Sequence, residues 1–142
     1  MRNNMKIIFP AIPENESLAR TVCAAFVLEL DPTVEEMSEI RTAVSEAVTN
    51  SVIHGYNGSG GDIEIDAELD GRTVTYTIKD NGCGIENIEK AKEPLYTGSS
   101  DSERSGMGFS IMEAFMDKLE VESMPGKGTV VKLVKKIEAD DE

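Results

Sequence analysis

Cysteine is scarce in this chain, where only Cys23 and Cys83 occur among 142 residues. Two separated cysteines form neither a disulfide framework nor a C-x-x-C pair, so they predict a reducing compartment. The first residues, Met1 to Met5, lack the apolar core of a signal peptide, and no run of about 18 apolar residues occurs. These absences argue against a spanning helix or a disulfide-rich secreted scaffold, and they predict a cytoplasmic protein.

Basic residues are also few. The chain has 14 Lys and Arg against 27 Asp and Glu, which gives a formal net charge of −13. Nucleic acids bind basic surfaces, so this balance argues against direct nucleic-acid binding and is compatible with a basic protein partner. A bound polyphosphate would need local help from Mg²⁺, from an arginine or from helix N-termini.

The common nucleotide-binding motifs are missing as well. The P-loop pattern is absent, because Lys127 is followed by Gly128 rather than by serine or threonine. No strand-associated G-x-G-x-x-G occurs, and the protein-kinase H-R-D motif is excluded because the only histidine, His54, precedes Gly55. Any nucleotide site must therefore belong to a different fold.

Apolar periodicity and turn residues predict the element order β-α-α-β-β-α-α-β-β. Strands are expected at 5–9, 63–69, 74–80, 119–123 and 129–134, and helices at 15–30, 33–54, 85–92 and 106–116. Helices in pairs between hairpins predict an α+β two-layer sandwich, a mixed and mostly antiparallel sheet with helices on one face. We expect a single domain over residues 1–136 and a disordered acidic tail over 137–142.

Local signals set the ends of several elements. Asn15 is expected to cap the first helix. The apolar face of this helix should comprise Leu18, Val22, Ala25, Phe26 and Leu30. Thr33 followed by Glu36 is a capping-box pattern that should open the long second helix. A strong hairpin signal lies between the second and third strands, at residues 70–71.

Three polar residues recur at helical spacing on the second helix. Glu46, Asn50 and His54 lie four positions apart, so they should form one stripe opposite a small, mostly apolar face. Taken alone, such a stripe is usually only a solvated face. Three glycine-containing stretches downstream change this interpretation.

The first of these stretches is Asp80-x-Gly82-x-Gly84, just after a strand. A carboxylate there can accept a hydrogen bond from an exocyclic amine, and the glycines let a flat ring approach the backbone. Alone, the stretch would be read as a turn.

The second stretch, Ser105-Gly106-Met107-Gly108, is expected to open a helix whose free N–H groups bind an anion. Arg104 beside it supplies a positive charge for a terminal phosphate. The third stretch, Gly126-x-Gly128-Thr129, reads as a hairpin turn that could place a hydroxyl near a base.

In this order and spacing, the four stretches resemble the motifs of the GHKL superfamily of ATPases and kinases, also called the Bergerat fold. Within this superfamily, three segments of the chain are most similar to the anti-sigma F factor family of endospore-forming bacteria: Glu14–Arg20, Val44–Tyr56 and Glu103–Phe109. This resemblance covers nearly the whole chain except the acidic tail.

The resemblance implies an anti-sigma factor and serine protein kinase in one domain. Such a protein binds ATP and Mg²⁺, acts as a homodimer, holds a sporulation sigma factor inactive, and phosphorylates a serine of an anti-anti-sigma protein. By the same resemblance, Glu46 is the general base, Asn50 is the Mg²⁺ ligand, and Asp80 accepts from the adenine amine with help from Thr129.

The resemblance also implies the other contacts of the nucleotide and of the partners. The remaining nucleotide-binding residues would be His54, Gly82, Gly84, Thr97, Arg104, Ser105, Gly106, Met107 and Gly108. Residues 97–105 would form a lid over the phosphates, and Arg20 would contact both protein partners. The chain departs from the family pattern in the lid, which lacks the expected lysine and proline. Cys83 is also unusual in the first glycine stretch, where we interpret it as a small spacer.

Three alternatives remain open. The protein could be a nucleotide-gated binding module with negligible kinase activity, although such a module needs no base at Glu46. It could be a related stress-response switch kinase that acts on another sigma factor. A free-standing histidine-kinase catalytic domain is disfavoured, because no phospho-accepting histidine helix precedes Glu46. If the homodimer forms, the free edge of the first strand is a plausible seam.

Overall fold

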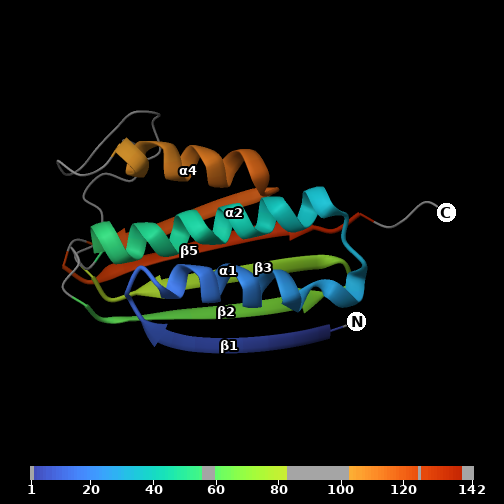
Figure 1. The fold of residues 1–142 in the computed structure, drawn as a ribbon, viewed down its shortest axis with the longest axis horizontal. Helices are drawn as coiled ribbons and strands as arrows, with labels where there is room; N and C mark the ends of the chain where they lie inside the picture. The colour runs from blue at the N-terminus through green and yellow to red at the C-terminus, as the bar shows by residue number, and fades with distance from the viewer. Residues whose placement is uncertain (1, 56–59, 83–102, 125, 139–142) are drawn as a thin grey trace.

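The computed structural model describes residues 2–55, 60–82, 103–124 and 126–138 (Figure 1). Five strands form one sheet: β1 (Arg2–Pro10), β2 (Asp62–Asp70), β3 (Thr73–Asp80), β4 (Lys118–Met124) and β5 (Gly128–Lys136). The helices are α1 (Asn15–Phe26), η1 (Leu28–Leu30), α2 (Val34–Asn50), η2 (Ser51–Gly55) and α4 (Glu103–Phe115). The helix predicted at 85–92 lies outside the described residues.

The sheet order is β1-β2-β3-β5-β4, and all four pairings are antiparallel. Figure 1 shows α1, α2 and α4 side by side on one face of the sheet. The predicted α+β two-layer fold is therefore confirmed. The opposite face carries charged pairs, such as Lys79 Nζ with Asp66 Oδ2 at 3.2 Å, so it needs no helical cover.

Strict alternation along the strands defines the core. On β3, the buried positions run from Val74 through Tyr76 and Ile78 to Asp80, so every second side chain faces the helices. The Tyr76 hydroxyl donates to the backbone oxygen of Cys23 in α1, which satisfies the one polar atom of that ring. Burial raises the pKa of both groups, that of the Cys23 thiol to about 12.

The apolar face predicted for the first helix is only partly right: Leu30 is buried and Phe26 packs against the core, but Leu18 and Ala25 are exposed. Leu18 is 49% exposed, whereas Ala19, Cys23 and Ala24 are buried. Small residues bring α1 close to the sheet and to α2, so the helix buries its small side chains and leaves the larger Leu18 in solvent. Asn15 does not cap the helix either; its side chain donates to the Pro10 oxygen at 2.9 Å.

The start of α2 has the capping box that was predicted from the sequence. Thr33 Oγ1 accepts from the N–H of Glu36, and the Glu36 carboxylate accepts from the N–H of Thr33, which is a capping box. Glu36 Oε2 also accepts from the N–H of Glu138 at 2.9 Å. Burial alone would raise the pKa of Glu36, but these backbone hydrogen bonds and nearby Lys135 lower it below its ordinary value.

The two residues that follow β5, Ile137 and Glu138, are ordered, although the sequence predicts that the disordered tail begins at residue 137. Arg72, in the β2–β3 turn, donates to the backbone oxygens of Leu30, Ile137 and Glu138 at 2.7–3.0 Å. Ile137 is fully buried. Ile137 and Glu138, assigned above to a disordered tail, are thus fixed in place, because a buried apolar side chain and three backbone bonds outweigh the acidic composition.

Candidate functional site

Asp80 and Thr129 lie opposite each other at one end of the sheet. They are Cα partners in the β3–β5 register, and each continues a row of buried side chains that faces the helices. Both side chains are therefore directed toward the end of α2, although strand-end carboxylates are usually solvated. Burying a carboxylate costs free energy unless hydrogen bonds satisfy it.

Two hydrogen bonds satisfy the Asp80 carboxylate. The Ser51 hydroxyl donates to Oδ2 at 2.7 Å, and the N–H of Gly82 donates to Oδ1 at 2.9 Å. An ionised carboxylate has about four lone-pair positions, so Asp80 can accept a further N–H donor. The arrangement suits recognition of an exocyclic amine.

The role of Ser51 was not predicted from the sequence. Its signal was present: a hydroxyl on a packed helix face needs a buried partner, and Asp80 is the acidic residue at the nearby strand end. On the other side, Ser123 Oγ lies 2.9 Å from Thr129 Oγ1 and donates to the Gly128 oxygen at 3.0 Å. The Thr129 hydroxyl is thus oriented by β4.

Gly128 allows β5 to touch the turn after β3. Its φ is 106°, and an added Cβ would lie 2.1 Å from the backbone oxygen of Asp80 and 2.8 Å from the Cα of Asn81. Only glycine fits there, because the obstacle is rigid backbone and because L-residues rarely adopt this φ. The third glycine stretch therefore fixes Thr129 against Asp80.

Glu46, Asn50 and Gly108 come together where α2 packs against α4. A Cβ on Gly108 would lie 3.2 Å from Asn50 Nδ2 and 3.4 Å from both Asn50 Oδ1 and Glu46 Oε1. Glu46 and Asn50 thus share one face of α2, as predicted, and both side chains on that face lie close to Gly108 of α4. The Asn50 Nδ2 is buried and has no hydrogen-bond partner among the described residues.

The predicted stripe of three ends at Asn50. The α-helix stops there, and Ser51–Gly55 forms a π-helical turn, η2. A π-helix closes its hydrogen bonds over five residues rather than four, so His54 no longer follows the spacing of Glu46 and Asn50. Ser51, the first residue of this turn, keeps α-helical dihedrals and its N–H still bonds to the oxygens of Ala47 and Val48. Such turns are frequent at functional sites.

Helix α4 begins at Glu103, three residues before its predicted start. The first four N–H groups of a helix lack intrahelical partners, so here they extend from Glu103 to Gly106. Gly108 lies beyond these four N–H groups, and its lack of a side chain lets α4 pack closely against Glu46 and Asn50 of α2. The side chains of His54, Arg104, Ser105 and Met107 lie outside what the structure describes, as do the whole of Gly84, Thr97, Cys83 and the predicted lid up to residue 102.

Arg20 lies on α1, away from the Asp80 end of the site. Its Nε is 3.5 Å from Glu16 Oε2, and the same carboxylate oxygen accepts a hydrogen bond from Ser45 Oγ at 2.5 Å. The side chain is 40% exposed, less than an entirely solvated arginine. Glu16 thus connects Arg20 to the residue that precedes Glu46.

No group of three or more His, Cys, Asp or Glu in the described part could hold a metal ion, so a magnesium ion there would depend on few protein ligands and on phosphate oxygens. No described helix is long and apolar enough to cross a membrane.

The chain is similar to known proteins along nearly its whole length. A family model described as a histidine kinase-like ATPase domain matches residues 9–135. The anti-sigma F factor of Thermoanaerobacter sp. (strain X514) is 54% identical over 138 residues, covering 97% of this chain and 96% of that protein. The anti-sigma F factor of Clostridium acetobutylicum is 54% identical over 136 residues, with 96% and 95% covered.

A solved structure shares the fold. The catalytic domain of the histidine kinase ThkA superposes with a TM-score of 0.59 at 16% identity, covering 94% of this chain and 96% of that one. At this identity the likeness supports the architecture alone. It agrees with the five-stranded sheet and the single helical layer described above.

Proposed function

Because the chain belongs to the histidine kinase-like ATPase family and, within it, to the anti-sigma F factors, we propose that it is an ATP-dependent serine protein kinase that also sequesters a sigma factor. In this proposal the ATP-bound protein holds a sporulation sigma factor inactive in the cytoplasm. It phosphorylates a serine of an anti-anti-sigma protein, which in unmodified form displaces the sigma factor.

The observation that carries the proposal is the meeting of Glu46, Asn50 and Gly108. A carboxylate and a carboxamide lie side by side where a glycine of α4 leaves space. A binder of nucleotide needs Asn50 and Asp80, but it has no use for a carboxylate beside them. Glu46 therefore favours phosphoryl transfer over the nucleotide-gated binding module.

Glu46 is proposed as the general base. It would accept the proton of the attacking serine hydroxyl, and general-base catalysis contributes roughly 10²–10⁴-fold to such a step. Its half-buried place on α2, next to a packed glycine, limits the rotamers it can adopt. Positioning and charge stabilisation carry most of the catalysis in phosphoryl transfer.

Asn50 is proposed as the protein ligand of Mg²⁺. Its buried Nδ2 has no hydrogen-bond partner among the described residues; this donor needs an acceptor, such as a phosphate oxygen, while the carboxamide oxygen is the atom that would face the ion. The carboxamide oxygen is the hard donor that Mg²⁺ prefers. When bound, the ion supplies charge neutralisation at the phosphates.

The other end of the site is proposed to bind the adenine. Asp80 has acceptor capacity left after its bonds from Ser51 and Gly82, and the Thr129 hydroxyl lies beside it in the register. The remaining nucleotide contacts stay as predicted from the sequence: His54, Gly84, Thr97, Arg104, Ser105, Gly106, Met107 and Gly108.

Two further parts of the proposal concern protein contacts. Arg20 is proposed to contact both the sigma factor and the anti-anti-sigma protein. The homodimer is proposed to form along β1, which pairs only with β2 and is an edge of the sheet. A monomer at high concentration by light scattering would refute this dimer.

Phosphate transfer from labelled ATP and Mg²⁺ to the anti-anti-sigma protein tests the central claim. Glu46→Gln should abolish detectable transfer and keep ATP binding, because only the proton acceptor is removed. Glu35→Gln is the matched control, since Glu35 is an exposed glutamate on the same helix; it should keep both activities. Asn50→Ala should weaken Mg²⁺-dependent ATP binding.

The outcomes separate the alternatives. Good ATP binding without transfer by the natural protein would favour the nucleotide-gated binder. Transfer to the anti-anti-sigma protein of a stress-response system, and none to the sporulation one, would favour the switch kinase. Failure to bind ATP would contradict the whole proposal.

A further inference from the structure

Lys135 is a buried lysine that has no part in the proposed mechanism. Its side chain is 8% exposed, although lysine is almost never buried without a partner. Its Nζ donates to Glu39 Oε1 of α2 at 2.8 Å and to the backbone oxygen of Phe115, the last residue of α4, also at 2.8 Å. Lys135 itself lies on β5, so one ammonium group joins the sheet to both helices.

The end of α4 is a favourable place for a positive charge. The last carbonyl groups of a helix lack intrahelical partners and form the negative end of its dipole. The chain just after Phe115 is fixed as well, since the N–H of Asp117 donates to the Val134 oxygen at 2.9 Å. The N–H of Lys136 donates to Asp117 Oδ2 at 2.6 Å. The C-terminal end of α4 is thus held to β5, and Lys135 adds a link to α2.

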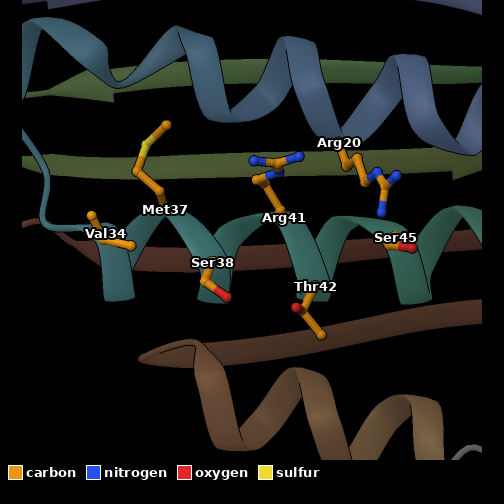
Figure 2. Close-up of a pocket in the computed structure, with 7 residues that line it drawn as sticks. All are labelled: Arg20, Val34, Met37, Ser38, Arg41, Thr42 and Ser45. Carbon is orange, nitrogen blue, oxygen red and sulfur yellow. The ribbon is translucent and has the colours of Figure 1, made fainter.

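A second contact between the same two helices lies at the nucleotide site, where Glu46 of α2 meets Gly108 of α4. Glu46 lies two helical turns after Glu39, and Gly108 lies two turns before Phe115, so the two contacts are about 10.5 Å apart along each helix. Figure 2 shows Thr42, which lies between Glu39 and Glu46, extending from α2 toward α4. One face of α2 therefore meets α4 at two points, and Lys135 makes the point far from the nucleotide.

We propose that Lys135 is a positioning residue, which holds the N-terminal end of α4 at the distance from α2 that the phosphates of ATP require. From Phe115 to Glu103 the helix is about 18 Å long, so a tilt of about 3° at the Phe115 end would move Glu103 by about 1 Å. A misplacement of about 1 Å can reduce a reaction rate by about 100-fold. The inference rests on the proposed function, since it assumes that the phosphates bind at the N-terminal end of α4.

The test compares the binding of ATP with that of adenosine, because adenosine would reach only the Asp80 end of the site, on β3 and β5. Lys135→Met removes the ammonium group and keeps a long side chain. The affinity for ATP with Mg²⁺ should fall by about tenfold, and that for adenosine by less than about twofold, because only the phosphate end loses its preorganisation. Phosphate transfer at saturating ATP should also fall by about tenfold or more. Lys136→Met, the same change at the exposed neighbouring lysine, is the matched control and should alter neither affinity.

A second variant separates positioning from stability. Glu39→Met combined with Lys135→Met replaces the ion pair by two apolar side chains, an exchange that often restores stability. Its urea unfolding midpoint should match that of the natural protein. The losses of ATP affinity and of transfer should remain, because Phe115 still lacks its link to α2. This variant carries the test if Lys135→Met alone does not fold.

The results that would overturn the inference differ from those that would overturn the proposed function. A natural ratio of ATP affinity to adenosine affinity in both variants would show that α4 is positioned without Lys135, and would leave the function standing. Recovery of ATP affinity together with stability in the double variant would give Lys135 a structural role only. Failure of the natural protein to bind ATP would remove the proposed function as well.

Discussion

Replacing Gly108 by alanine should separate the stability of the fold from its binding of nucleotide. The new Cβ would lie 3.2 Å from Asn50 Nδ2, so the Asn50 side chain must yield by a few tenths of an ångström, and 3.4 Å from Glu46 Oε1, which is at the limit of ordinary contact. Both are ends of side chains and can yield. The change therefore acts on the proposed magnesium ligand and the proposed base together.

The expected magnitudes follow from this geometry. Alanine is favoured over glycine inside a helix by about 0.5–1 kcal/mol. Moving Asn50 away from its preferred rotamer costs about 0.5–1.5 kcal/mol. These terms nearly cancel, so the free energy of unfolding should change by less than about 1 kcal/mol. ATP affinity should fall by about tenfold or more, equivalent to about 1.4 kcal/mol.

Urea unfolding and calorimetric titration with ATP and Mg²⁺ measure the two quantities on one preparation. Ala114→Gly, at an exposed position of the same helix, is the matched control; it should lower stability slightly and leave ATP affinity unchanged. Natural ATP affinity in Gly108→Ala would refute the placement of Asn50 in the phosphate end of the site. A loss of several kcal/mol in stability would show that the neighbouring side chains cannot yield.

Three further predictions concern stability. Gly128→Ala should cost about 3 kcal/mol or more, because its Cβ would meet the backbone oxygen of Asp80 at 2.1 Å and its φ of 106° is strained for alanine; urea unfolding of a variant with natural stability would contradict this. Arg72→Ala should cost about 1–3 kcal/mol by leaving three backbone oxygens without their donor, and thermal unfolding of Arg72→Lys should show only partial recovery. Burial raises the pKa of Cys23 from 9.0 to about 12. The contribution of the protonated Cys23 thiol to the free energy of unfolding is therefore fully present below pH 9 and is lost as the pH rises toward 12. Between pH 9 and 10 the Cys23 contribution to the loss should approach about 1.4 kcal/mol per pH unit. Cys23→Ala should remove this contribution and leave the smaller one of buried Tyr76, whose pKa is also raised; an unchanged slope would assign the loss to another group.

Features that depend on neighbours in the sequence were predictable. The capping box of Thr33 and Glu36 and the hairpin turn after Asp70 are set within a few residues, and both appear where the sequence places them. The alternation of β2 and β3 also predicts their buried face, since the period of two leaves no choice. The fold class followed from these elements and their order.

Features that depend on packing were not predictable in the same way. The buried face of α1 is set by close approach to α2, which favours Ala19 and Cys23 over the larger Leu18. The hydrogen bond from Ser51 to Asp80 joins residues 29 positions apart, and helical spacing alone does not show which strand end the Ser51 hydroxyl meets. The prediction that Glu46 and Asn50 share one face agrees with the structure because both residues lie within the regular part of α2.

The position of β1 in the sheet has a consequence for synthesis. Arg2 pairs with Asp70, 68 positions along the chain, and both α1 and α2 lie between the two strands. At roughly 5–20 residues per second, translation leaves β1 without its partner for roughly 3–14 s. During this interval β1 has an open edge, and it cannot join the sheet until two helices and one further strand have been synthesised.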